Sequence, residues 1–234
     1  MKAIFKRECA AYFTSPIGYV YLTAFCVFAG YYLFMGVLIQ NRNVLTPVFS
    51  NMINIVMVLM PLLTMRLMTE DRRSRTDQLL LTAPVTLWGI ALGKFFAAAA
   101  LYALGLSVTL VFGAIISFFS MPNWGMILGN FIALLLLGLS FIAIGQFISA
   151  TTENQATAAI GSFAAMLALF LLDALPSVLP HPGLSRLVAG LSFLRRYAPI
   201  ANGILSIPNL LFFLSACAIF LFLTTRVLEK RRWG

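Results

Sequence analysis

Residues 125–149 read GMILGNFIALLLLGLSFIAIGQFIS, a stretch without a single charged side chain. An α-helix needs about 20 mostly apolar residues to cross the hydrocarbon core of a bilayer. The stretch is longer than that, and Gly125 and Gly129 near its start are spaced for close packing against a neighbouring segment. A membrane-spanning helix is therefore the first element that the sequence predicts.

The composition of the whole chain agrees with a membrane protein. Of its 234 residues, 61% are apolar and 10% are charged, and the mean hydropathy is +0.96. Soluble domains contain roughly 45–50% apolar and about 25% charged residues. The formal net charge of +9 would suggest a nucleic-acid partner in a soluble protein. Here the basic residues lie at the ends of apolar runs, so no nucleic-acid partner is expected.

Six stretches in all are long and apolar enough to predict spans, in one all-α membrane domain over residues 1–234. They are 17–39, 48–68, 94–119, 125–149, 156–176 and 208–225. Lys and Arg are enriched in cytoplasmic loops. With a cytoplasmic N-terminus, twelve of the 16 Lys and Arg residues fall inside and four outside. Both termini are therefore predicted to be cytoplasmic, with membrane lipids around the spans.

Three segments outside the spans have a distinct character. Residues 2–14 place apolar side chains on one side of a helix, which predicts a helix in the membrane interface. Residues 184–194 repeat Leu and Val at helical spacing, which predicts an amphipathic helix on the outer surface. Residues 69–93 form the longest cytoplasmic connection and combine charges of both signs with a leucine run at 79–81. This mixture favours docking onto a soluble partner over a solvated loop.

Residues that carry chemistry are few. The run from Gly89 to Lys94 and Phe95 is one residue short of a phosphate-binding loop and lacks its hydroxyl, so we expect no catalytic activity and no bound cofactor. The 3 cysteines and 1 histidine have no metal-ligand spacing. Asp173 is the one intramembrane polar candidate, with a solvated position at the outer interface as the alternative. Ion-coupled transporters carry several such groups, so the energy is expected to enter through 69–93.

Glu8 falls on the apolar side of the predicted interfacial helix, where an unpaired carboxylate would be unfavourable. Arg66 and Lys94, at the inner ends of the second and third predicted spans, are the nearest plausible partners. The sequence therefore predicts an ion pair between Glu8 and one of these two cations, in a structural role or in coupling.

Four blocks, in this order, resemble the ABC-2 type permease family. They are Lys6-Arg7-Glu8 to Ser15-Pro16-Ile17, Pro61-Leu62-Leu63 through Thr82-x-Pro84 to Leu92-Gly93-Lys94, Thr152-x-Asn154-Gln155, and Gly203-Ile204-Leu205 to Arg231-Arg232-Trp233. The closest subgroup is the gliding-motility-associated GldF-like permeases. The chain departs from the family at three positions, with Arg75 in place of a common Gly and with Gln78 and Ser206 in place of acids.

The resemblance implies the permease subunit of an ATP-driven exporter in the bacterial inner membrane. It implies a second permease chain, identical or related, and two copies of an ATP-binding subunit that holds the ATP and Mg²⁺. Residues 2–14 would be the elbow helix, 69–93 would hold the coupling helix, and 177–207 would hold re-entrant helices. The candidate residues for the ATPase contact are Glu70, Asp71, Arg72, Arg73, Thr76, Gln78, Leu79, Leu80, Leu81 and Pro84.

Two other functions stay open at this point. The chain could be a membrane anchor that transmits ATPase motion to an extracytoplasmic or motility machine, with an extracytoplasmic accessory protein as a further partner. A stand-alone secondary transporter is disfavoured because the spans lack charges near their centres. The substrate is left open among polysaccharide, lipid, peptide and drug-like molecules.

Overall fold

The computed structural model of the chain describes residues 2–39, 45–73, 76, 85–119, 121–177, 188–204 and 206–233. Over these residues the secondary structure is helical, with no strand. The elements are α1 (Lys2–Thr14), α2 (Pro16–Leu33), the π-helix η1 (Phe34–Leu38), α3 (Thr46–Thr64), α4 (Arg66–Arg73), α6 (Leu87–Ser117), α7 (Trp124–Thr151), α8 (Gln155–Leu171), the 3-10 helix η2 (Leu175–Ser177), α10 (Phe193–Ala201) and α11 (Ile207–Trp233).

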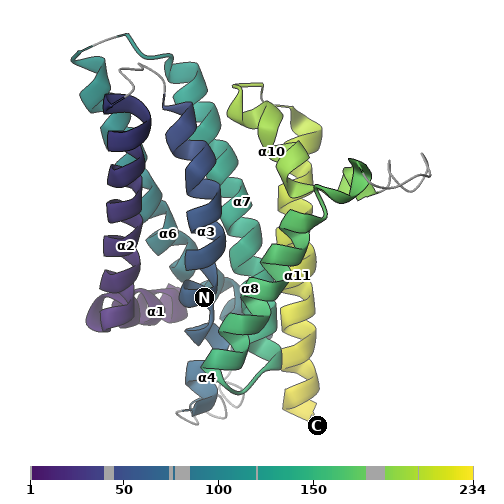
Figure 1. The fold of residues 1–234 in the computed structure, drawn as a ribbon. Helices are drawn as coiled ribbons and strands as arrows, with labels where there is room; N and C mark the ends of the chain where they lie inside the picture. The colour runs from purple at the N-terminus through teal and green to yellow at the C-terminus, as the bar shows by residue number, and fades with distance from the viewer. Residues whose placement is uncertain are drawn as a thin grey trace.

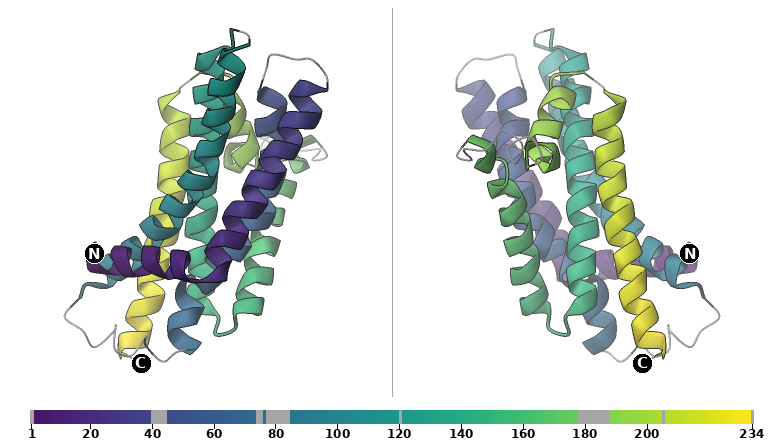
Figure 2. Two further views of the ribbon diagram at one scale, coloured as in Figure 1. Left: turned by 90° about the vertical axis from the view of Figure 1, so that its left-hand side faces the viewer. Right: turned by 90° about the vertical axis from the view of Figure 1, so that its right-hand side faces the viewer.

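The long helices form an upright bundle, and α1 lies across one end of it (Figures 1 and 2). Helices α2, α6 and α8 run away from that end, whereas α3, α7 and α11 run towards it. Helices α1 and α4 and the last turns of α11 therefore share one end, which we call the α4 end. The short helix α10 packs on α7 and α11 at the opposite end.

Five helical segments of the described residues are long and apolar enough to cross a membrane. They are Pro16–Leu38, Thr46–Arg72, Leu87–Ser117, Trp124–Thr151 and Ile207–Arg232, and they coincide with five of the predicted spans. Helix α8 is apolar but has 17 residues. It ends at Leu171 rather than at the predicted 176, and a turn and then η2 follow it. Pro176 has no N–H to continue the α-helical hydrogen bonds, and its ring would clash with the carbonyl group of residue 172 in an α-helix.

The backbone N–H groups in the first turn of a helix have no acceptor within the helix, and a side-chain oxygen at the preceding residue can accept from one of them. Thr86 Oγ1 accepts from the N–H of Gly89 at 3.2 Å at the start of α6, and Ser192 Oγ accepts from the N–H of Arg195 at 3.2 Å at the start of α10. The Ser192 cap shows that one helix over 184–194 is wrong. Residues 188–191 are helical, the helix breaks at Ser192, and 184–187 lie outside the described residues.

Glycines allow neighbouring segments to approach α7, the central helix, very closely. A Cβ atom at Gly138 would lie 2.3 Å from the Tyr102 ring of α6, and one at Gly145 would lie 2.3 Å from Thr64 Oγ1 of α3. At Gly129 it would lie 2.6 Å from the carbonyl oxygen of Ile200, at the end of α10. Small residues are the usual means of close packing within membranes, and here they let α7 contact three segments at once.

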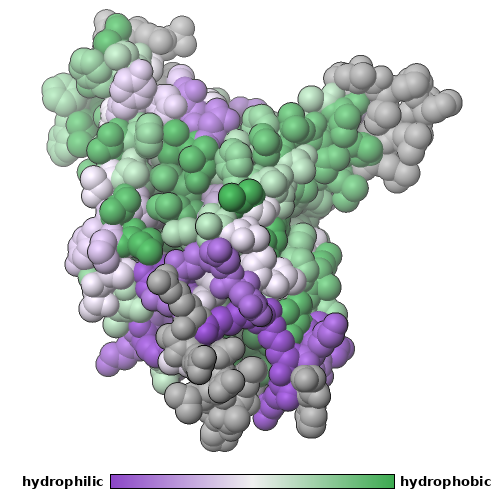
Figure 3. Space-filling view, turned by 60° about the horizontal axis from the view of Figure 1, so that its bottom comes forward, coloured by the Kyte–Doolittle hydropathy of each residue, from purple (hydrophilic) through white to green (hydrophobic). Residues whose placement is uncertain are grey.

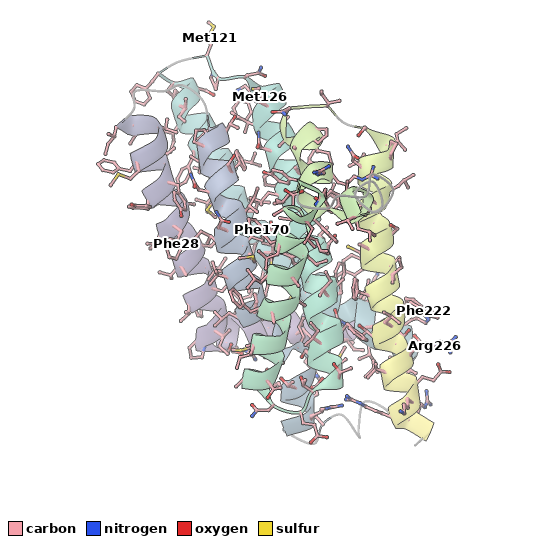
Figure 4. The ribbon with its side chains drawn as sticks, turned by 45° about the vertical axis from the view of Figure 1, so that its right-hand side comes forward. Phe28, Met121, Met126, Phe170, Phe222 and Arg226 are labelled. Atoms are coloured by element: carbon pink, nitrogen blue, oxygen red, sulfur yellow. The ribbon has the colours of Figure 1, made fainter. Side chains whose placement is uncertain are left out.

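The sides of the bundle are apolar and its α4 end is polar. Phe28 on α2 and Phe222 on α11 lie at opposite edges of the bundle and point away from it (Figure 4). Seen from below, hydrophilic side chains gather over the α4 end, and hydrophobic side chains cover the flanks above them (Figure 3). Large exposed apolar surfaces are unfavourable in water, so this distribution suits a chain whose flanks contact lipid.

We expect Gly138→Ala to destabilise the bundle by about 1–3 kcal/mol, because the added methyl group would overlap the ring of the buried Tyr102. Thermal unfolding of the purified protein in detergent, followed by circular dichroism, measures the loss. Gly30→Ala is the matched control, since nothing lies within 4 Å of a Cβ atom at that position. Equal transition temperatures for the two variants would contradict the close contact between α6 and α7.

Candidate functional site

Four charged side chains from three helices meet at the α4 end, and we call them the charged network. Arg7 and Glu8 belong to α1, Asp71 to α4 and Lys94 to α6. The Lys94 side chain is 2% exposed, and its Nζ lies 3.0 Å from Glu8 Oε1 and 2.6 Å from Asp71 Oδ2. It also donates to the backbone carbonyl of Leu67 at 2.6 Å. Each of the three ammonium protons therefore has an acceptor.

Arg7 covers the network on its more exposed side. Its Nη2 lies 3.0 Å from Glu8 Oε1 and 2.9 Å from Asp71 Oδ1. Burial lowers the pKa of Arg7, but the hydrogen bond to Glu8 and the charges of Asp71 and Glu8 outweigh this effect and raise that pKa overall. Two cations thus face two anions that are each 13% exposed, so the buried charges compensate one another.

Arg66 makes a second link between α1 and the segment that contains α4. Its Nε and Nη2 donate to the two carboxylate oxygens of Glu70 at 2.6 and 2.9 Å. Its Nη1 donates to Ser15 Oγ, and its guanidinium carbon lies 5.4 Å from the centroid of the Tyr12 ring. A fork-to-fork pair of this kind fixes orientation as well as charge, so the first turns of α4 are held against the junction of α1 and α2.

The sequence named two partners for Glu8, and the structure separates them. Lys94 contacts Glu8, whereas Arg66 contacts Glu70. Both cations lie near the α4 end of their helices, and hydropathy alone does not say which of them faces α1. Asp71, which the sequence predicts in a contact with a partner protein, is shared between Lys94 and Arg7 within the chain, and the partner contact stays a prediction.

Ser149 of α7 bridges the break between α3 and α4. Helix α3 ends at Thr64 and α4 begins at Arg66. Ser149 Oγ accepts from the N–H of Met68 at 3.1 Å and donates to the carbonyl of Met65 at 3.1 Å. It satisfies backbone groups that a helix break leaves without partners. The sequence did not point to this residue, because a single serine in an apolar run is typical of ordinary helix packing.

Two arginines bind the end of α7, where the last carbonyl groups lack partners in their own helix. Arg72 Nη1 donates to the carbonyl of Thr152 at 2.6 Å, and its Nη2 donates to that of Ala150 at 3.2 Å. Arg231 of α11 also donates to the carbonyl of Ala150. A cation at this position is favoured by the helix dipole. Arg72 is therefore engaged within the chain, and its contact with a partner stays a prediction.

The remaining coupling candidates divide into two groups. Thr76 Oγ1 donates to the backbone and side-chain oxygens of Asp71 at 3.3 and 3.1 Å, and Arg73 ends α4. The other candidates lie outside the described residues, namely Gln78, Leu79, Leu80, Leu81 and Pro84. The described part of the predicted coupling segment is thus bound to the body of the bundle before the leucine run begins.

Asp173 lies at the opposite end of the molecule, in the turn that follows α8. Its Oδ1 accepts from Ser192 Oγ and lies 3.6 Å from Arg195 Nε, with the side chain 30% exposed. Ser192 is the N-cap of α10, so Asp173 connects the end of α8 to the start of α10. This position differs from the bundle interior that an intramembrane charge would occupy.

In the part of the chain that the structure describes, no group of three His, Cys, Asp or Glu side chains could hold a metal ion. The amine, guanidinium and carboxylate groups of the charged network are paired with one another. Such an arrangement links α1, α4 and α6 to one another.

A family model described as ABC-2 family transporter protein matches residues 37–233. The match covers α3 to α11 and leaves out α1, α2 and most of η1. Comparison with curated proteins returns no match.

We expect Lys94→Met to lower the free energy of unfolding by about 3–5 kcal/mol, because it leaves the Glu8 and Asp71 carboxylates buried with one cation fewer. Chemical or thermal unfolding in detergent measures the change. Arg226→Gln is the control, since it removes a cation from the exposed pair with Glu229, and such pairs contribute at most about 1 kcal/mol. A loss no larger than that of the control would mean that the charged network adds nothing to stability.

Proposed function

Since the chain belongs to the ABC-2 transporter family, we propose that it is the permease subunit of an ATP-driven exporter in the bacterial inner membrane. As a family member it is a multi-pass membrane protein and a transmembrane component of an ABC transporter, not its ATP-binding unit. The observation that carries the proposal is the family match over residues 37–233.

The proposed topology has six spans, with α8 as the fifth in order, and both termini in the cytoplasm. Helix α7 arrives at the α4 end and α11 starts at the opposite end, so the chain between them must return across the bundle. The 17 residues of α8 measure about 26 Å at 1.5 Å per residue, close to the roughly 30 Å of a bilayer core. The enrichment of Lys and Arg at the α4 end supports a cytoplasmic position for that end.

We propose that α1 is the elbow helix and that the segment after α4 holds the coupling helix, which contacts the ATP-binding subunit. The support is the way in which α4 is attached. It is joined to α1 and α6 through Asp71 and Lys94, and to α7 through Ser149 and Arg72. A force on the segment that follows α4 would therefore act on three helices of the bundle at once.

The proposed assembly contains two ATP-binding subunits, which supply the bound ATP and Mg²⁺, and a second permease chain, identical or related. The GldF-like subgroup remains part of the proposal, on the sequence blocks at 6–17, 61–94, 152–155 and 203–233. A full set of subunits is expected to copurify from mild detergent. Isolation of a single permease chain that supports ATP-driven transport would contradict the paired arrangement.

An anchor that transmits motion without moving a solute would use the same contacts, so the two functions need a direct test. The chain is reconstituted in liposomes with the ATP-binding subunit that copurifies with it, and ATP hydrolysis is measured with candidate solutes on the cytoplasmic side. We expect one solute class to raise the hydrolysis rate and to cross the membrane in an ATP-dependent way. Hydrolysis that drives no solute across would favour the anchor.

We expect Leu80→Ala or Leu81→Ala to weaken binding of the ATPase by more than about 1 kcal/mol, because truncated apolar anchors reduce association more than rim charges do. A quantitative pull-down of the coexpressed ATPase measures the effect. Arg72→Ala is the comparison, since Arg72 already donates to α7 carbonyls and its loss should act on stability first. If Arg72→Ala weakened binding more, charges around 70–75 would carry the docking.

A further inference from the structure

An apolar groove opens on the flank where α1, α6 and α7 meet, with a volume of about 650 Å³. Its wall is made of Ala99, Ala100 and Ala103 of α6 and Leu135 and Leu139 of α7. The groove exists because the three α6 residues on this face are alanines. Larger side chains at these positions would fill the space. Lys2 of α1 is the charged residue in the lining.

The groove runs along α6, away from the α4 end, and α1 borders it at its foot. Glu8 of α1 contacts Lys94, and the groove residues from Phe96 to Ala103 follow Lys94 along α6. This length corresponds to about 10 Å of helix. Lys2 and Phe5, in the N-terminal turn of α1, line the groove together with these residues of α6. The left panel of Figure 2 shows α1 lying across the lower part of the bundle.

We propose that this groove binds an acyl chain of an anionic phospholipid, whose phosphate is held by Lys2. A helix that lies across a bundle in this way, with exposed lysines, belongs at the level of the lipid headgroups. The wall above it is apolar and suits the acyl chain. The inference requires only that the chain is a membrane protein, so it does not depend on whether a solute is exported.

A helix from a second copy of the chain is the other candidate for this surface, and the geometry disfavours it. A helix with its side chains is about 10–12 Å wide and would have to continue past the foot of the groove, where α1 lies across its path. A lipid ends at that level, with its headgroup beside Lys2. The positive charge of Lys2 adds a preference for anionic over zwitterionic headgroups, worth a factor of about five for one lysine near the membrane surface.

The charge requirement is tested by native mass spectrometry of the protein purified with equal amounts of phosphatidylglycerol and phosphatidylcholine that carry the same acyl chains. We expect retained phosphatidylglycerol to exceed phosphatidylcholine, and Lys2→Gln to reduce the ratio about fivefold. Lys6→Gln is the matched control, because Lys6 is an exposed cation of the same helix that does not line the groove. Equal effects of the two variants, or no preference in the wild type, would overturn the proposal.

The groove itself is tested by filling it. Ala103→Phe should remove most of the retained lipid, whereas Leu104→Phe, on an exposed neighbouring position of α6, should retain it. Circular dichroism verifies folding, and Ala100→Val is a smaller change to the same wall if the phenylalanine variant fails to fold. Undiminished lipid in Ala103→Phe or Ala100→Val would overturn the site. A loss of self-association with lipid retained would assign the surface to a second copy of the chain.

Discussion

The arrangement of helices at the α4 end depends on the burial of one charged group, the Lys94 ammonium. At 2% exposure, this charge is stable only if every proton finds an acceptor and the charge is balanced nearby. Glu8 of α1, together with Asp71 and the Leu67 carbonyl of α4, meets this demand. The need to satisfy one cation therefore fixes α1 across the foot of α6 and holds α4 against both. Because the loss of a partner would leave a buried charge uncompensated, these three helices are expected to move as one unit.

The same reasoning explains the path of the chain at the α4 end. Helix α3 stops at Thr64 and the next helix starts at Arg66, which would leave backbone groups without partners inside the molecule. Ser149 supplies partners on the side of α7, and Arg72 in turn supplies donors to the last carbonyl groups of α7. The two helices thus satisfy each other's ends, a reciprocal arrangement. Under the proposed function, this is the connection through which an ATPase would act on the central helix of the bundle.

The sequence was sufficient to predict those features of the fold that depend on a pattern extending over many residues. Long apolar runs predicted five segments that the structure contains as long helices, because a helix satisfies its own backbone hydrogen bonds within one segment in lipid. Features that depend on one side chain were not predictable. The end of α8 at Leu171 lies inside a predicted apolar span, and the break at Ser192 lies inside a predicted amphipathic repeat, so neither pattern placed the helix end. Ser149 looked like any small residue in an apolar helix. The choice of Lys94 over Arg66 as the partner of Glu8 depends on the rotation of two helices, which hydropathy does not encode. The candidates from Gln78 to Pro84 stay predictions.

The distribution of buried surface explains how such a chain can persist in a membrane while its flanks remain uncovered. Within an 18-residue apolar stretch of the α7 segment Trp124–Thr151, 67% is buried, whereas the corresponding share is 22% in Pro16–Leu38 and in Ile207–Arg232. In water such flanks would drive aggregation, but lipid tails are as apolar as the side chains, so exposure to lipid carries no penalty. The force that holds the bundle together must then come from close contacts, and the glycines of α7 provide them at Tyr102, Thr64 and Ile200. The close contacts at these glycines therefore determine how the central helices pack. The side chains on the flanks do not have to fit against a neighbouring helix of the same chain. The proposed contacts with a lipid and with a second permease would both lie on these flanks, so neither would require the centre of the bundle to rearrange.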